Sequence, residues 1–224
     1  MPDWSAATAM SAEQAWGPAV LDHYERALWT RTALRLDDEG GTPVAFDVSR
    51  WLRAPDAADR TILDRCTGPT LDIGCGPGRL VAALTARGIP ALGVDIAAAA
   101  VALTRSAGAL ALRRSVFDRV PGAGRWRTAL LADGNVGIGG DVGGLLSRIR
   151  DLLAPGAHAV VEVERGDTVE RLTARIVTTT GETASFPWAR VGAAAMLEIA
   201  EFCGFHPVEL WVCGERCFVN LQRI

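Results

Sequence analysis

The sequence predicts an α/β fold in which helices cover both faces of a mostly parallel β-sheet. Short apolar segments alternate with helical segments between Pro69 and Val163. The chain has 224 residues, of which 49% are hydrophobic, enough for one sizeable core. Strands that alternate with helices pair in parallel through right-handed crossovers, and helices then cover both faces. The expected architecture is therefore a three-layer αβα domain.

The first 68 residues are expected to form an N-terminal helical cap, ahead of a main domain over residues 69–224. Apolar residues at helical spacing predict a helix from Ser11 to Leu36, ended by the acidic and glycine residues that follow. A second helix is expected from Ser49 to Cys66, because a Gly-Pro pair comes soon after it.

The first half of the main domain is expected to contain two strand–helix units. A short apolar strand over residues 70–73 leads into a glycine-rich loop, and a helix follows from Arg79 to Arg87. The second strand, residues 89–94, ends next to Asp95 and precedes an alanine-rich helix over residues 97–107. This order is typical of a parallel sheet.

The rest of the parallel sheet is predicted from shorter segments. Strands are expected over residues 109–112, 128–132 and 157–163. A helix over residues 142–153, with Asp141 as its N-cap, separates the last two.

The C-terminal part departs from this alternation. Residues 175–185 are expected to form a small hairpin or extended excursion, and a helix follows over residues 191–203. Strands over residues 207–212 and 216–221 are joined by a tight turn, so they must run antiparallel to each other. The sheet is thus mostly parallel with an antiparallel C-terminal strand.

The loop after the first strand carries the strongest functional signal. In such a sheet, ligands bind beyond the carboxyl ends of the strands, beside the first strand. Gly74, Gly76 and Gly78 allow a sharp turn and a close backbone approach to a ligand. The spacing is G-x-G-x-G, whereas a dinucleotide fold would need a glycine at the position of Arg79. Asp72, two residues before the first glycine, would repel a pyrophosphate and suits an ammonium group.

This loop resembles that of class I S-adenosylmethionine-dependent methyltransferases, and the resemblance extends over residues 69–164. It implies a Rossmann-like domain that binds S-adenosylmethionine (SAM) and releases S-adenosylhomocysteine (SAH). It also implies a methyl transfer by in-line displacement. The loop residues that the resemblance places around the cofactor are Asp72, Gly74, Cys75, Gly76 and Gly78.

Two further segments are compared with this family. Asp95, about 20 residues after the loop, is in the position that accepts both ribose hydroxyls, and Ile96 would lie against the adenine. After the third strand the family commonly has an acidic residue, but here that position is Ser115. The adenine contacts are therefore expected either from Asp118 in place of this acid or from backbone groups near Val116 and Phe117.

The reacting methyl group is expected near the end of the fourth strand. Asp133 and Asn135 begin a glycine-rich loop there, and they are predicted to contact the amino-acid end of the cofactor or the acceptor. In the cap, His23 is a candidate general base, as is Asp133 in the loop. Tyr24 and Trp29 either line the pocket or pack the cap onto the domain.

Composition narrows the acceptor class. The net charge of -3 and the lack of a basic run argue against nucleic acid, so a small-molecule acceptor of O- or N-methylation is expected. No apolar stretch is long enough for a membrane span, and five irregularly spaced cysteines suggest a cytoplasmic protein without a metal site. A non-catalytic SAM-binding partner or sensor protein and an NAD-dependent oxidoreductase stay open as alternatives. Oligomeric state cannot be derived from these residues.

Overall fold

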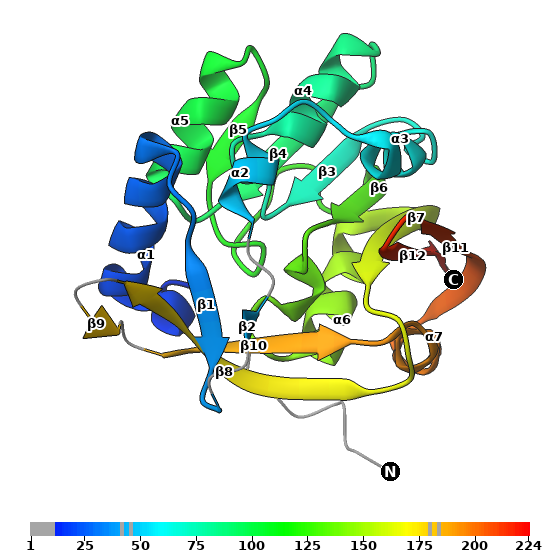
Figure 1. Ribbon diagram of the computed structural model, residues 1–224. Helices are drawn as coiled ribbons and strands as arrows, with labels where there is room; N and C mark the ends of the chain where they lie inside the picture. The colour runs from blue at the N-terminus through cyan, green and yellow to red at the C-terminus, as the bar shows by residue number, and fades with distance from the viewer. Residues whose placement is uncertain (1–11, 41–42, 45–46, 179–180, 183–184) are drawn as a thin grey trace.

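The computed structural model describes residues 12–40, 43–44, 47–178, 181–182 and 185–224. The larger sheet has seven strands in the order β11-β12-β7-β6-β3-β4-β5 (Figure 1). In chain order these strands are β3 (Thr70–Ile73), β4 (Ala91–Asp95), β5 (Ala111–Arg113), β6 (Trp126–Leu131), β7 (Leu153–Val163), β11 (Phe205–Cys213) and β12 (Arg216–Arg223).

The pairing of these strands confirms the predicted sheet. β3 lies in the middle and pairs in parallel with both β4 and β6. All four of its residues are buried, as expected for a strand covered on both faces. β12 is antiparallel to both of its neighbours, β7 and β11. The turn between β11 and β12 contains Gly214, which has a positive φ of 62°.

Helices cover both faces of the seven-stranded sheet, which confirms the three-layer αβα architecture. α3 (Ala57–Leu63), α4 (Arg79–Ala86) and α5 (Ala98–Ser106) share one face, where Val81 and Leu84 are fully buried. α6 (Val142–Leu152) and α7 (Ala193–Phe202) share the other face. Asp141 caps α6 as predicted, because its carboxylate accepts a hydrogen bond from the backbone N–H of Gly144.

A second, antiparallel sheet lies beside this domain and was not predicted. Its main path is β10-β8-β1-β2, and β9 pairs with β8. The segment expected to form a small excursion contributes to β8 and β9, although residues 179–180 and 183–184 lie outside the described residues. The strands are β1 (Arg35–Asp38), β2 (Pro43–Val44), β8 (Val169–Thr178), β9 (Gly181–Glu182) and β10 (Phe186–Val191).

The N-terminal cap differs from the two long helices expected. α1 (Ala12–Thr30) is kinked at Gly17, and the predicted continuation to Leu36 is wrong because Arg35–Asp38 pairs with β8. Ser11, where the helix was expected to begin, lies outside the described residues. The helix predicted from Ser49 to Cys66 is in fact two short helices.

Those two short helices are α2 (Val48–Trp51) and α3, with a break before Pro55. Asp56 and Asp59 begin α3 with reciprocal side-chain to backbone hydrogen bonds, a capping box that favours a new start at this point. The division of the chain at residue 68 stays a prediction, and the pairing of β1 with β8 connects the two parts.

Candidate cofactor and acceptor site

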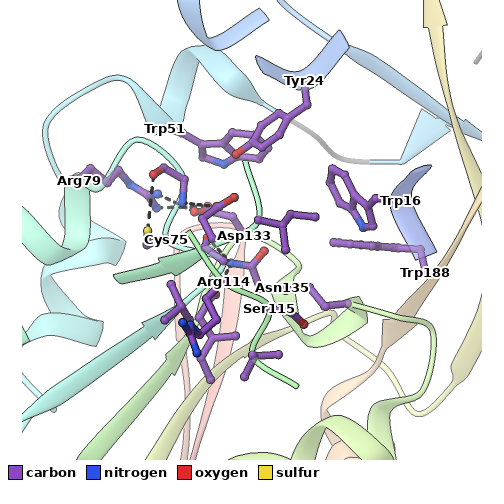
Figure 2. Close-up of a pocket in the computed structure, with 18 residues that line it drawn as sticks. Trp16, Tyr24, Trp51, Cys75, Arg79, Arg114, Ser115, Asp133, Asn135 and Trp188 are labelled. Carbon is purple, nitrogen blue, oxygen red and sulfur yellow. Dashed lines mark hydrogen bonds and ion pairs between the residues drawn. The ribbon is translucent and has the colours of Figure 1, made fainter. Parts of the chain in front are cut away.

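A cavity of about 730 Å³ lies at the carboxyl ends of the central strands (Figure 2). Its walls come from the glycine loop after β3, the end of β4, the segment after β5, the loop after β6, and α1, α2 and β10. The parallel sheet therefore brings the predicted cofactor residues to one place. The predicted residues that line the cavity are Tyr24, Gly74, Cys75, Gly76, Asp95, Ile96, Val116, Asp133 and Asn135.

The glycine loop has a conformation that other residues would adopt only with strain. Gly74, Gly76 and Gly78 have φ values of 69°, 54° and 86°. Gly78 does not line the cavity. A Cβ there would lie 2.5 Å from the Thr104 side chain, so this glycine allows close packing of the loop against α5.

Asp95 faces this loop from the end of β4. Its two carboxylate oxygens accept hydrogen bonds from the backbone N–H groups of Gly76, at 2.9 Å, and Ala97, at 2.8 Å. Burial raises the pKa of Asp95 to about 6, and these hydrogen bonds oppose the shift. A carboxylate has about four acceptor positions, so Asp95 can still accept a hydrogen bond from a hydroxyl group of a ligand.

Asp72 lies in β3 behind the glycine loop and is 2% exposed. It is not among the residues that line the cavity. Burial raises its pKa to about 7, while the charge of Arg79 opposes the shift. An additional cation at the glycine loop would favour the ionised carboxylate, which is what the ammonium role requires.

Asp133 is held in a buried network of charges. Arg79 donates to Asp133 at 2.6 Å and to Asp59 at 2.8 Å, and Arg216 also contacts Asp59 at 2.7 Å. The backbone N–H of Asp133 donates to Glu162 at 2.6 Å, and its φ of 58° is positive. Burial raises the pKa of Asp133, and Arg79 opposes this effect.

The same network explains why Arg79 occupies the position of the third glycine in a dinucleotide loop. Burial alone would raise the pKa of Asp59, but the hydrogen bonds and charges of Arg79 and Arg216 hold it well below its usual value. Arg79 therefore links α3 to the loop after β6 and starts α4 at the same time. No pattern in the sequence indicated this pairing of Arg79, Asp59 and Asp133.

Asn135 connects the loop after β6 to the glycine loop. Its side-chain Nδ2 donates to the backbone carbonyls of Ile73, at 2.8 Å, and Gly74, at 2.9 Å. A Cβ on Gly74 would lie 2.8 Å from this amide. Asn135 therefore lines the cavity and also supports the loop that the cofactor would approach.

The segment after β5 contributes to the far end of the cavity. Val116 lines it together with Arg114 and Ser115, two residues that had no predicted contact role. Of the other two predicted residues, Phe117 packs against the core beside α6, and the backbone carbonyl of Asp118 accepts a hydrogen bond from Arg148. Neither is among the cavity-lining residues, and their adenine contacts stay predictions.

Four aromatic side chains form the remaining wall. They are Trp16 and Tyr24 from α1, Trp51 from α2 and Trp188 from β10, and each is less than 9% exposed. Figure 2 shows Tyr24 beside Trp51 and Trp16 beside Trp188. Trp16 and Trp51 were missed because they are far apart in the sequence and only the cap brings them together.

Two further residues of the cap do not line this cavity. His23 is half-buried on α1, and its role as a general base stays a prediction. Trp29, near the end of α1, is 59% exposed, so it is not a wall of the pocket. Tyr24 lines the cavity, and burial raises the pKa of its hydroxyl well above the usual value.

A second cavity of about 720 Å³ adjoins the first and shares Trp51, Asp133 and Trp188 with it. Charged groups of both signs line it, among them Arg50 and Glu162. Within the described ranges, no group of histidine, cysteine and acidic residues is arranged to hold a metal ion. None of the helices in those ranges is both long and apolar enough to cross a bilayer.

No protein-family model matches the sequence, and no curated protein is significantly similar to it. Several solved structures are, however, similar to the structure of this chain. A SAM-dependent methyltransferase from Bacteroides fragilis, in complex with SAH, is 21% identical with a TM-score of 0.73, over 96% of this chain and 97% of that one.

Two other similar structures are of N-methyltransferases. The 1,6-didemethyltoxoflavin-N1-methyltransferase of Burkholderia thailandensis, with its substrate and SAH bound, is 17% identical with a TM-score of 0.65, over 98% of this chain and 92% of that one. The glycopeptide N-methyltransferase MtfA, complexed with sinefungin, is 14% identical with a TM-score of 0.58, over 77% and 88%. This protein has the fold of the SAM-dependent methyltransferases.

Proposed function

We propose that this protein is a SAM-dependent methyltransferase that transfers a methyl group to the oxygen or nitrogen of a small molecule. The observation that carries the proposal is the position of Asp95 opposite the glycine loop. The backbone N–H groups of Gly76 and Ala97 orient its carboxylate, which lines the cavity and can accept a further hydrogen bond from a ligand. This arrangement suits a ligand with two adjacent hydroxyl groups, such as a ribose.

The other walls fit the remaining parts of the cofactor. Ile96 and Val116 offer apolar surface for the adenine, and Gly74 and Gly76 let the backbone approach the amino-acid end. Asp72 provides the counter-charge for the ammonium group from behind the loop. When bound, SAM supplies an activated methyl group on a positively charged sulfur.

The chain's own residues orient the acceptor and exclude water. Methyl transfer depends above all on alignment, and effective alignment requires rigid walls. Trp16, Tyr24, Trp51 and Trp188 are packed against one another and close the cavity on the acceptor side. Because its pKa is raised, the Tyr24 hydroxyl stays protonated and acts as a hydrogen-bond donor.

The enclosed aromatic wall supports a small acceptor, in line with the net charge of -3, which disfavours nucleic acid. Two of the similar structures are of N-methyltransferases, one of them with 1,6-didemethyltoxoflavin bound. A cytoplasmic location accords with the reduced cysteines expected from their spacing and stays a prediction.

A non-catalytic SAM-binding partner or sensor protein is the main alternative, since binding residues alone do not establish turnover. An NAD-dependent oxidoreductase is disfavoured by a specific contact. Arg79 occupies the position of the third dinucleotide glycine, and its guanidinium is engaged by two buried carboxylates and is 7% exposed.

Calorimetric titration of the purified protein with SAH, and with NAD as a control ligand, tests the proposal. We expect micromolar SAH binding that Asp95→Ala abolishes and that Asp151→Ala, at a side chain that is 60% exposed, leaves unchanged. Failure to bind SAH, or tight binding of NAD, would overturn it. Binding of SAH without methyl transfer to any acceptor in a metabolite extract would favour the sensor alternative.

A further inference from the structure

The four aromatic residues of the acceptor wall form a continuous cage. Ring centroids are 5.8 Å apart for Trp16 and Tyr24, 6.1 Å for Trp16 and Trp188, and 6.1 Å for Tyr24 and Trp51. All three pairs are close to edge-on, with interplanar angles of 63°, 62° and 83°. Rings that meet at such angles form the sides of an aromatic box, and their faces attract flat rings and cations.

Two residues of this cage lie where the two cavities adjoin. Trp51 and Trp188 line both of them, whereas Trp16 and Tyr24 line only the cavity that contains Asp95. A flat ring held in the cage would therefore be next to the glycine loop on one side. Its substituents would extend into the second cavity, where Arg50, Glu162 and Arg190 offer polar partners of both signs.

The acidic side chains of the cavity are already engaged. Asp95 accepts two backbone hydrogen bonds and is assigned to the cofactor. Asp133 is paired with Arg79 at 2.6 Å and with Arg50 at 3.2 Å. Neither carboxylate is placed as an independent proton acceptor.

The remaining titratable groups at the cavity are no better suited to take a proton. The Tyr24 hydroxyl and the Cys75 thiol are buried in apolar surroundings that favour their protonated forms, and the thiol donates to the carbonyl of Gly76. Arg79 and Arg114 are cations. Among the described lining residues there is no histidine.

From the cage and the absence of a proton acceptor among these lining residues, we infer that the acceptor is a planar nitrogen heteroaromatic. Its acceptor atom is a ring nitrogen that carries no proton at neutral pH. The inference rests on the proposed function. The ring nitrogen uses its lone pair to form the new N–CH₃ bond, and the electron pair of the broken S–CH₃ bond stays on sulfur. The positive charge therefore passes to the ring, where the aromatic faces stabilise it, and no proton has to be removed.

The first test compares ring-shaped probes on the wild-type protein saturated with SAH. Quinoline is flat with an unprotonated nitrogen, 1-naphthol has the same shape with a hydroxyl group, and decahydro-1-naphthol is a puckered, uncharged ring system of similar size. We expect calorimetry to detect quinoline and 1-naphthol, and decahydro-1-naphthol to bind roughly tenfold more weakly. With SAM in place of SAH, mass spectrometry should find methylated quinoline only, at a rate that is flat between about pH 6 and 9.

The second test asks whether the cage is responsible. Trp188→Leu and Trp51→Leu should each weaken quinoline binding about tenfold while SAH affinity stays unchanged. Trp29→Leu, which removes an exposed tryptophan of α1 that does not line the cavity, should have no effect. Preserved SAH affinity also shows that a variant is folded.

Several results would overturn the inference. They are methylation of 1-naphthol but not quinoline, equal binding of decahydro-1-naphthol, no quinoline binding to SAH-loaded protein, and equal effects of Trp188→Leu and Trp29→Leu. If SAH itself fails to bind, the proposed function fails instead, so the two failures are distinguishable.

Discussion

Replacing Asp72 with asparagine should stabilise the free protein and weaken its binding of SAH. The carboxylate is 2% exposed, and burial raises its pKa to about 7 from the usual 3.8. A carboxyl group whose pKa is higher in the folded state destabilises that state when it ionises. Stability therefore falls as the pH rises from about 4 to 7, and the full cost is present above pH 7.

The magnitude follows from the size of the shift. A difference of about three pKa units corresponds to about 4 kcal/mol. Asparagine removes the charge but brings an amide that needs a partner at this buried position, which costs about 2 kcal/mol. The net gain at pH 8 is thus about 2 kcal/mol, or roughly 4–8 °C in melting temperature for a chain of this length.

Urea and thermal unfolding of both proteins between pH 4 and 8 measure this gain, and calorimetry measures SAH affinity at pH 8. The difference in stability should shrink as the pH falls and change sign toward pH 4, where both side chains are neutral and only the cost of the buried amide, about 2 kcal/mol, remains. SAH affinity should fall by tenfold or more, because the ammonium group loses its buried counter-charge. Asp151→Asn, at an exposed position, controls for the change in net charge.

Two outcomes would refute this reasoning separately. If Asp72→Asn destabilises the protein at pH 8 and leaves the pH dependence of unfolding unchanged, burial of the charge is not a cost to folding. If the variant is more stable but binds SAH like the wild type, Asp72 is not the counter-charge of the cofactor.

The scaffold of the site supports two more predictions. Gly78→Ala should destabilise the fold by about 2–5 kcal/mol, because φ is 86° and the new Cβ would lie 2.5 Å from Thr104. Its control is Gly88→Ala, at a φ of 75° with no neighbour within 4 Å, which should lower the free energy of unfolding in urea by only about 1 kcal/mol. Arg79→Met should cost about 3–5 kcal/mol by leaving two buried carboxylates without their main partner, whereas Arg87→Met, at a partly exposed ion pair, should cost under about 1 kcal/mol. Equal costs within either pair of variants would contradict the packing or the charge argument.

The parallel sheet could be predicted from the sequence because its signals are local. Thr70–Ile73 is a short apolar run followed directly by glycines, and Asp95 ends the next strand at the expected distance. Each signal depends on a few neighbouring residues, and the order of strands then brings the segments to one edge of the sheet. For this reason the glycine loop and Asp95 do meet at a single cavity.

The cap could not be predicted in the same way, because its structure depends on contacts between distant residues. Leu36 continues the apolar spacing of α1, yet it is buried in a strand that pairs with Ile176, far along the chain. Helical spacing alone cannot distinguish a longer helix from a strand here, because pairing with β8 determines which of the two forms. The aromatic cage depends on the same assembly, since Trp51 from α2 and Trp188 from β10 of the second sheet line the same cavity.

The buried carboxylates of this protein divide by how their charge is compensated, and this division separates scaffold from binding site. Asp59 is 1% exposed and contacts two arginines, so its pKa is lowered and ionisation stabilises the fold. Asp72 and Asp95 are also buried, but their pKa values are raised, so the ionised carboxylates are less stable in the folded protein than in water. A buried charge that the protein itself does not compensate is stabilised by a ligand that brings an ammonium or hydroxyl groups. Asp72 and Asp95, two of the carboxylates predicted to contact the cofactor, are therefore left under-compensated by folding, and the binding energy of the ligand is available to offset that cost.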